Sequence, residues 1–245
     1  MSVPDYDKKL IFRPATDFER DVALENIRYR FRYTADSEAK LLRLAEQEPT
    51  SPRPYEILAA ISTHDKQSAA ALDRRKKAAE LGSTNPFVYL QLANPLVREM
   101  RTAVSLDYRI PENECAQLRA WLDRTIQLSP EYWEAYETLA FVEAFADKPR
   151  AEVIDTIQGT VKWMRDPQHT LIPLAALRWR IKDYATTETI LSLAEKRSSL
   201  DPLEKTLTAE LRKQLAADRA RRAVVEPSPS TSSEPAETRG AESAK

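Results

Sequence analysis

Apolar residues recur three and four positions apart along most of the chain, which is the spacing of one face of an α-helix. Three stretches align with one another without a gap: residues 43–59, 77–93 and 124–140. In each, an aromatic residue stands three positions before a leucine and four before an alanine. Because these positions share a helix face, they predict a packing ridge beside an alanine that lets a neighbouring helix approach closely. The copies are Tyr55, Leu58 and Ala59; Tyr89, Leu92 and Ala93; and Tyr136, Leu139 and Ala140.

The copies are evenly spaced apart from one insertion. The first two begin 34 residues apart, and the third begins 47 residues after the second, a difference of 13. The extra residues are expected near 100–112, where helical periodicity breaks before Pro111 opens the next helix at a position that tolerates proline. Each unit is therefore predicted to be a helix, a turn and a second helix.

Extending this register in both directions predicts five helix pairs and one last helix over 201–223. Leucines at spacing four give the last helix a single apolar stripe, as a helix that caps the end of an array requires. The expected pairs are 17–31 with 35–48, 52–63 with 66–81, 86–99 with 111–128, 131–146 with 149–165, and 168–181 with 184–199.

The two ends of the chain are predicted to lie outside this helical domain, which spans 17–223. Residues 1–16 are expected to form an extended lead-in. Residues 224–245 are rich in Pro, Ser, Glu and Ala and cannot offset an ordering cost of about 1–2 kcal/mol per residue. This tail is therefore predicted to be disordered.

Two local features leave alternatives open. Apolar residues alternate over 27–33 as they would in a strand, although the repeat register favours a helix there. Pro95 and Pro173 fall inside expected helices. Each is expected to bend its helix, and the bend is either absorbed by packing or opens the inner surface to a ligand.

A period of 34 with a helix–turn–helix in each unit resembles the tetratricopeptide repeat. The resemblance rests on the aromatic-x-x-Leu-Ala element, on Ala78, and on Pro49 and Pro130 near unit boundaries. Arg75 and Leu122 depart from it, because a bulky aromatic is usual at their positions. The resemblance implies an all-α, right-handed α-solenoid of helix hairpins that binds a protein or peptide partner in a concave groove and is not an enzyme.

Composition excludes several other classes of protein. The chain has only 3 glycines, so a phosphate-binding loop or a dinucleotide fold is not expected. Its 37 basic and 38 acidic residues give a net charge of −1, which offers no general attraction to nucleic acid or to an anionic membrane. No apolar run is long enough for a signal peptide or a membrane span, so a cytoplasmic protein is expected.

The residues that carry catalysis are few and scattered. His64 and His169 are expected at helix turns and starts, and Cys115 has no histidine at helical spacing. No pair of cysteines or histidines has the spacing of metal ligands. The sequence therefore predicts no catalytic residue, no metal and no cofactor. The four tryptophans are expected to pack between helices.

The resemblance also implies which residues face the groove, since the first helix of each hairpin lines it. Aromatic and charged residues of both signs would gather there, a mixture that suits a bound peptide or helix. Counting from the packing ridges, the groove residues are Arg53, Glu56, Phe87, Asn94, Arg98, Glu134, Glu137, Phe141, Phe145, Trp179 and Arg180.

A second interpretation follows from the first unit, which lacks a clear N-terminal cap. The chain is also similar to the C-terminal repeat regions that follow peptidase-like domains in larger bacterial proteins. On that view it is a self-assembling or accessory structural module, and residues around 12–31 pack on a further domain or on a second copy. Whether it forms a homo-oligomer stays open.

Overall fold

The protein is built from helix hairpins. The computed structural model describes residues 16–30, 36–102, 105–164, 167–196 and 200–225, and these contain helices and no strand. The predicted all-α class is confirmed. The helices are α1 (Asp17–Arg30), α2 (Ser37–Gln47), α3 (Arg53–His64), α4 (Ser68–Glu80), α5 (Pro86–Arg101), α6 (Glu112–Leu128), α7 (Trp133–Phe145), α8 (Ala151–Thr160), the 3-10 turn η1 (Val161–Trp163), α9 (Gln168–Arg180), α10 (Tyr184–Glu195) and α11 (Pro202–Val225).

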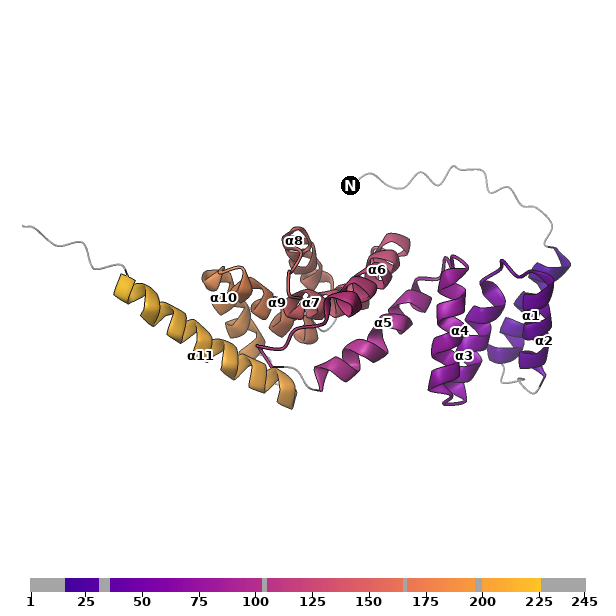
Figure 1. Cartoon of the computed structure of the whole chain (residues 1–245), viewed down its shortest axis with the longest axis horizontal. Coiled ribbons are helices and arrows are strands. Elements are labelled where there is room, and N and C mark those ends of the chain that lie inside the picture. Colours follow the sequence, from indigo (N-terminus) through magenta and orange to yellow (C-terminus); the bar gives the residue numbers. More distant parts are fainter. Residues whose placement is uncertain (1–15, 31–35, 103–104, 165–166, 197–199, 226–245) are drawn as a thin grey trace, which may run out of the picture.

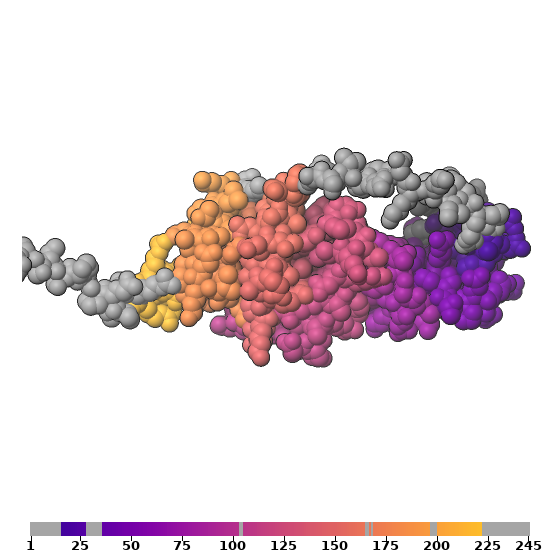
Figure 2. Space-filling view, turned by 90° about the horizontal axis from the view of Figure 1, so that it is seen from above, coloured from indigo at the N-terminus to yellow at the C-terminus, as the bar shows by residue number. Residues whose placement is uncertain are grey.

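The helices stack as a solenoid. Each odd-numbered helix from α1 to α9 packs on the helix that follows it, and α5, α7, α9 and α11 pack successively on one another. In Figure 1, α6, α8 and α10 lie on one side of the array, while α5 and α11 lie on the other. The space-filling view shows the colours following one another along the long axis, so neighbours in sequence are neighbours in space (Figure 2).

The repeated element occupies equivalent positions in the stack. Its leucines and alanines are at most 2% exposed in all three copies. The Tyr89 hydroxyl donates a hydrogen bond to the Ser83 carbonyl and the Tyr136 hydroxyl donates one to the Pro130 carbonyl, both at 2.9 Å and both six residues back. Tyr55 is half-buried and packs between the N-terminal and the middle cluster of apolar side chains. Two of the three tyrosines therefore share one environment.

One turn geometry recurs at three helix ends. Lys66, Gly82 and Lys182 follow α3, α4 and α9 with φ of 60°, 74° and 65°, the left-handed region. In each turn the next amide donates to the carbonyl five residues back, which satisfies a carbonyl at the helix end. Only one of the three positions is a glycine, so the lysines adopt a backbone conformation that glycine would adopt more readily.

The inserted residues connect the end of α5 to the start of α6 and pack against α7 on the way. Leu106 and Ile110 are 3% and 1% exposed. The Ile110 amide donates to the Phe145 carbonyl at 2.9 Å, and the Leu106 amide donates to Glu210 Oε2 of α11 at 3.3 Å. The segment 105–111 is thus packed against the end of α7 and joined to α11.

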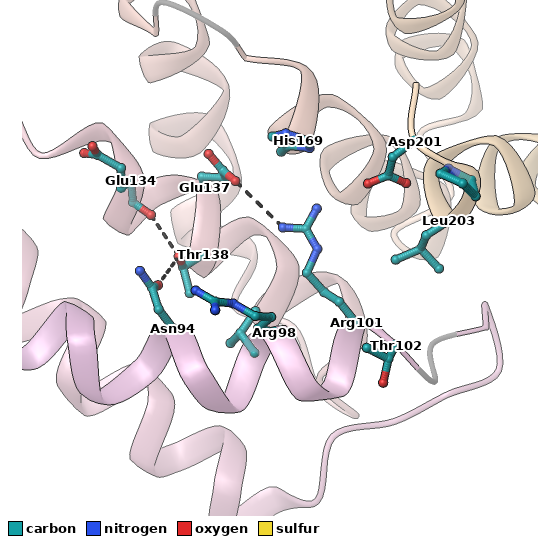
Figure 3. Close-up of a pocket in the computed structure, with 12 residues that line it drawn as sticks. Asn94, Arg98, Arg101, Thr102, Glu134, Glu137, Thr138, His169, Asp201 and Leu203 are labelled. Carbon is teal, nitrogen blue, oxygen red and sulfur yellow. Dashed lines mark hydrogen bonds and ion pairs between the residues drawn. The ribbon is translucent and has the colours of Figure 1, made fainter. Parts of the chain in front are cut away.

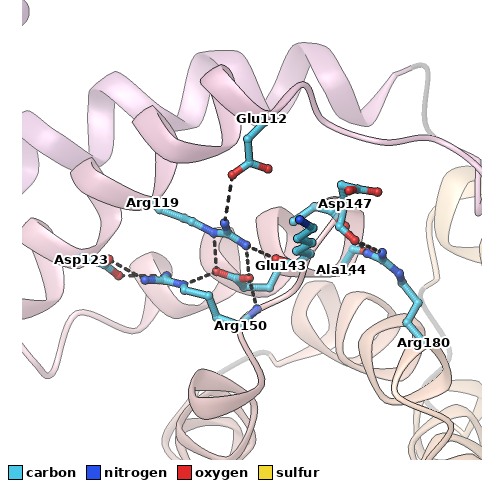
Figure 4. A network of polar contacts seen from close by, with 10 residues as sticks. Glu112, Arg119, Asp123, Glu143, Ala144, Asp147, Arg150 and Arg180 are labelled. Carbon is cyan, nitrogen blue, oxygen red and sulfur yellow. Dashed lines mark hydrogen bonds and ion pairs between the residues drawn. The ribbon is translucent and has the colours of Figure 1, made fainter.

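A buried ion cluster joins α6, α7 and α8 (Figure 4). Glu143 is fully buried and accepts hydrogen bonds from the guanidinium groups of Arg119, at 2.7 and 3.0 Å, and of Arg150, at 2.7 Å. Arg150 also donates to both carboxylate oxygens of Asp123. The hydrogen bond that Arg119 donates to Glu143 raises the pKa of Arg119 and thereby favours its charged form.

Some of the elements predicted from the sequence differ from the structure. Ile27 and Tyr29 lie in α1, so the strand alternative is wrong for them, while Phe31, Tyr33, residues 1–15 and 226–245 lie outside the described residues. The expected helix over 149–165 ends earlier, at Thr160, and continues as the turn η1. Trp163 in that turn is 71% exposed rather than packed in the core. Pro95 and Pro173 lie inside α5 and α9.

The tyrosine hydrogen bonds should be measurable in stability. We expect Tyr89→Phe and Tyr136→Phe each to lower the free energy of unfolding by about 1–1.5 kcal/mol, because each leaves a carbonyl without its donor. The control Tyr55→Phe should cost under about 0.5 kcal/mol, because the Tyr55 hydroxyl makes no hydrogen bond to the described residues. Urea unfolding followed by circular dichroism measures all three, and equal losses would contradict the assignment.

Removing the buried carboxylate should be costly. Glu143→Ala leaves Arg119 and Arg150 without their shared partner in the interior, and we expect a loss of about 3–5 kcal/mol. Gln117→Ala, at an exposed position on α6, should change stability by less than about 0.5 kcal/mol. Thermal unfolding compares the two variants, and a Glu143→Ala protein as stable as the control would show that the ion cluster is dispensable.

Candidate functional site

An open hollow lies where first helices of successive hairpins meet α11. This α5–α7 pocket has a volume of about 620 Å³ and is shown in Figure 3. Its walls come from α5, from the first turns of α7 and α9, and from the start of α11. The lining side chains are Asn94, Val97, Arg98, Arg101, Thr102, Glu134, Glu137, Thr138, His169, Asp201, Pro202 and Leu203.

The floor of the pocket is held by contacts between α5 and α7. Thr138 donates from its hydroxyl to Asn94 Oδ1 at 3.0 Å. Arg101 forms an ion pair with Glu137 at 3.8 Å, and its guanidinium carbon lies 5.7 Å from the centre of the Phe141 ring. Arg98 lies one helical turn before Arg101 and is exposed. The α5 wall is therefore basic and the α7 wall acidic.

The far wall is formed by the start of α11. Asp201 and Glu204 cap this helix reciprocally: the Asp201 amide donates to Glu204 Oε2 at 3.0 Å, and the Glu204 amide donates to Asp201 Oδ1 at 2.8 Å. His169 of α9 contacts Glu204 Oε1 through Nδ1 at 2.6 Å. One nitrogen or oxygen atom each of His169, Asp201 and Glu204 lies within 4.8 Å of the others, and such atoms can coordinate a metal cation. The helix cap already accounts for their arrangement.

The structure brings four of the predicted groove residues into this pocket: Asn94, Arg98, Glu134 and Glu137. Arg53 and Glu56 instead line a separate hollow of about 470 Å³ between α1, α3 and the turn before α5. There Glu56 accepts a hydrogen bond from the Ser83 hydroxyl at 2.5 Å. Phe87, 47% exposed at the start of α5, lines neither hollow.

Phe141 and Phe145 are corrected from groove residues to core residues. They are 2% and 1% exposed, with ring centres 4.8 Å apart. The insertion explains the difference, because the Tyr108 ring lies 6.4 Å from the Phe145 ring and Leu106 and Ile110 pack in the same cluster. Arg101 covers Phe141 from the pocket side.

Trp179 and Arg180 also have partners within the chain. The Trp179 indole nitrogen donates to Asp218 Oδ2 of α11 at 3.0 Å, so the last helix covers this end of α9. The Arg180 guanidinium donates to the carbonyls of Ala144 and Asp147, at 3.0 and 2.8 Å, beyond the end of α7. Burial and the neighbouring Arg109 lower the pKa of Arg180. These two residues hold helices together.

Eight of the twelve pocket residues were missed by the analysis of the sequence, among them Arg101, Thr138 and Leu203. Arg101 and Thr138 stand at helical spacings from Arg98 and Glu134, so extending the count by one turn would have found them. Leu203 had no such signal, because α11 was expected to cap the array rather than to form a wall of the pocket.

His64 and Cys115, which could take part in catalysis, lie outside the pocket. His64 lies beside Asp65 at 3.0 Å on an exposed turn. Cys115 is fully buried, and burial raises the pKa of its thiol, which opposes formation of the reactive thiolate. None of the helices in the described ranges combines the length and the apolar character needed to cross a membrane.

The corrected assignment of the phenylalanines has a measurable consequence. Phe145→Ala opens a cavity in the core, and we expect it to lower the free energy of unfolding by about 3–5 kcal/mol. Phe87→Ala removes an exposed ring and should cost less than about 0.5 kcal/mol. Urea denaturation distinguishes these outcomes. If Phe145→Ala leaves the stability unchanged, the assignment of the Phe145 ring to the core is wrong.

Comparison with known proteins gives structural neighbours only. No family model and no curated protein matches the sequence. Among solved structures, the chain is similar to YrrB, described as a TPR protein with an unusual peptide-binding site, at 13% identity and a TM-score of 0.50, over 84% of this chain and 92% of that one. Pseudomonas aeruginosa pilF matches at 17% identity, over 86% and 93%, with a TM-score of 0.48.

A third structure is a thermophilic TPR protein of Thermus thermophilus, at 14% identity over 83% of this chain and 99% of that one, with a TM-score of 0.38. At these identities the likeness concerns the fold. The likeness to YrrB agrees with the stacked hairpins and with the equivalent burial of the repeated Leu-Ala pairs. The chain has the helical-repeat fold of the tetratricopeptide repeat proteins.

Proposed function

We propose that this protein is a non-catalytic scaffold that binds an extended or helical segment of a partner protein in a groove lined by the first helices of its hairpins, centred on the α5–α7 pocket. The observation that carries the proposal is the charge of this pocket. Its α5 wall presents two arginines and its α7 wall presents two glutamates, around a space large enough for several peptide side chains.

Two of these charges are available to a ligand. Arg98 is exposed and Glu134 is half-buried, and neither forms an ion pair within the part of the chain that the structure describes. A partner that offers a carboxylate to Arg98 and a cation to Glu134 would satisfy both. Charge-assisted hydrogen bonds of this kind are stronger than neutral ones and give an interface its orientation.

The fold and the charge balance support a protein rather than a nucleic acid as the partner. A net charge of −1 gives no general attraction to phosphates. The similar fold of YrrB belongs to a protein described as having a peptide-binding site. A micromolar affinity, about −8 kcal/mol, would suit such a scaffold.

Selection from a phage-displayed library of random peptides tests the proposal. Peptides selected on the wild-type protein are synthesised with a fluorescent label, and their affinities are measured by fluorescence polarisation. We expect Arg98→Glu and Glu134→Arg each to weaken binding roughly 10- to 100-fold, the effect of losing a charged contact at the centre of an interface.

The control reverses a charge elsewhere. Lys76→Glu changes an exposed basic residue on α4, away from the pocket, and should leave the affinity unchanged. All variants should keep the wild-type circular dichroism spectrum. If no peptide is enriched, or if the enriched peptides bind Arg98→Glu and Glu134→Arg as tightly as the wild type, the α5–α7 pocket is not the binding site.

A further inference from the structure

Trp163 is 71% exposed, although the turn that carries it is anchored on both sides. Val161, at the start of η1, packs against the main apolar core. Met164 directly follows Trp163, is 7% exposed, and accepts a hydrogen bond from the Thr170 hydroxyl at 3.2 Å. The indole therefore projects from a fixed position in the fold. Tryptophan is enriched at interfaces, because it offers a large apolar body with a polar N–H.

A hollow of about 470 Å³ lies beside Trp163, between η1 and the start of α7. This volume falls in the range of small binding sites, roughly 300–1,000 Å³. Three of the six lining residues are aromatic and a fourth is proline, so rings form most of the wall. We call this site the tryptophan hollow, and it shares no lining residue with the α5–α7 pocket. Its residues are Pro130, Glu131, Trp133, Tyr136, Thr160 and Trp163.

The unused polar hydrogens of the tryptophan hollow belong to its two indoles. Within the described ranges, the indole nitrogens of Trp133 and Trp163 have no hydrogen-bond partner, and an indole N–H can only donate. The Tyr136 hydroxyl already donates to the Pro130 carbonyl at 2.9 Å, and the Thr160 hydroxyl donates within its own helix. A ligand that satisfies this site has to supply hydrogen-bond acceptors to the indoles and an apolar surface to the rings.

Glu131 is the one charged residue in the lining of the tryptophan hollow, as far as the structure describes it. The Ser129 hydroxyl donates to Glu131 Oε1 at 2.8 Å and lowers the pKa of this carboxyl, so it is ionised at neutral pH. Lys162 does not line the hollow, and its ammonium lies 5.2 Å from the centre of the Trp163 ring, whose face attracts it. A ligand with a basic group at the Glu131 end would complement the lining.

We propose that the tryptophan hollow binds a proline-rich segment of a partner protein, with a basic residue next to the prolines facing Glu131. Proline has a carbonyl acceptor and no amide donor, so it matches the two free indole donors of Trp133 and Trp163. Its ring is apolar and packs on aromatic side chains. The site is separate from the α5–α7 pocket and adds a second binding surface to the scaffold.

The conformation of the ligand follows from the same chemistry. A proline-rich segment adopts the polyproline II helix, which has no internal hydrogen bonds and leaves its carbonyls available to the indoles. An α-helical ligand uses its carbonyls internally, except in its last turn, and could not satisfy both indoles along its side. The polyproline II helix is also formed before binding, so less conformational entropy is lost when it docks.

Fluorescence polarisation with a labelled oligoproline peptide that ends in arginine tests the proposal on the full chain. We expect Trp163→Ala to weaken binding at least ~10-fold, because it removes both a ring and a donor. Trp163→Phe keeps a ring and removes only the donor, and should weaken binding roughly 3- to 10-fold. Glu131→Gln should weaken binding of this peptide and should not affect an oligoproline peptide that ends in glycine.

Two control variants separate this site from the rest of the surface. Phe87→Ala removes another exposed ring, outside both the tryptophan hollow and the α5–α7 pocket, and should bind the peptide like the wild type. Arg98→Glu, in the α5–α7 pocket, should also leave this affinity unchanged. The two proposals therefore fail separately. All variants should keep the wild-type circular dichroism spectrum, since the substituted side chains are exposed.

Several results would overturn the inference. One is the absence of binding up to about 1 mM peptide. Another is equal affinity of the wild type and Trp163→Ala, because the peptide then binds elsewhere. A third is equal binding of a peptide with alanine in place of every proline, because the site then does not select proline. A wild-type dimer, measured by light scattering, that Trp163→Ala dissociates would show that a second copy of the chain covers the tryptophan hollow instead.

Discussion

The contact between the insertion and the end of α7 is the constraint that places the aromatic side chains of α7 in the core. The Ile110 amide donates to the last carbonyl of α7, the Tyr108 ring lies 6.4 Å from the Phe145 ring, and Leu106 and Ile110 belong to the same apolar cluster as Phe141 and Phe145. The rings then belong to the core of the C-terminal hairpins.

With the aromatic rings covered, charge is what distinguishes the remaining hollow. The basic α5 wall and the acidic α7 wall are joined by the Arg101–Glu137 ion pair and by the Thr138–Asn94 hydrogen bond, so the pocket is held in shape before a ligand arrives. Binding governed by exposed charges weakens as salt is added, because their attraction is screened over about 8–10 Å. Specificity would come from the order of charges along the partner, and the scaffold would contribute little hydrophobic anchoring.

The spacing of residues along single helices was enough to predict the repeated helix hairpins. Aromatic-x-x-Leu-Ala spacing identified three equivalent helices, and Tyr89 and Tyr136 make the same hydrogen bond in two of them. The irregular period also located the insertion. The path of the insertion depends on contacts such as Ile110 with Phe145, which are far apart in sequence and leave no periodic signal. Counting residues by helix face therefore placed Asn94 and Glu137 in the pocket correctly but placed Phe145 there wrongly. It also did not predict that Trp179 would bind Asp218 of α11.

The most direct measurement is the exchange rate of the Ile110 amide by nuclear magnetic resonance. If the insertion is a fixed part of the core, this amide should exchange about as slowly as amides inside α7 and ~100-fold more slowly than the amide of the exposed Asp107, because only opening of the core frees it. An Ile110 amide that exchanges as fast as that of Asp107 would mean that the insertion leaves α7 readily. The phenylalanines would then be open to a partner, which contradicts this account.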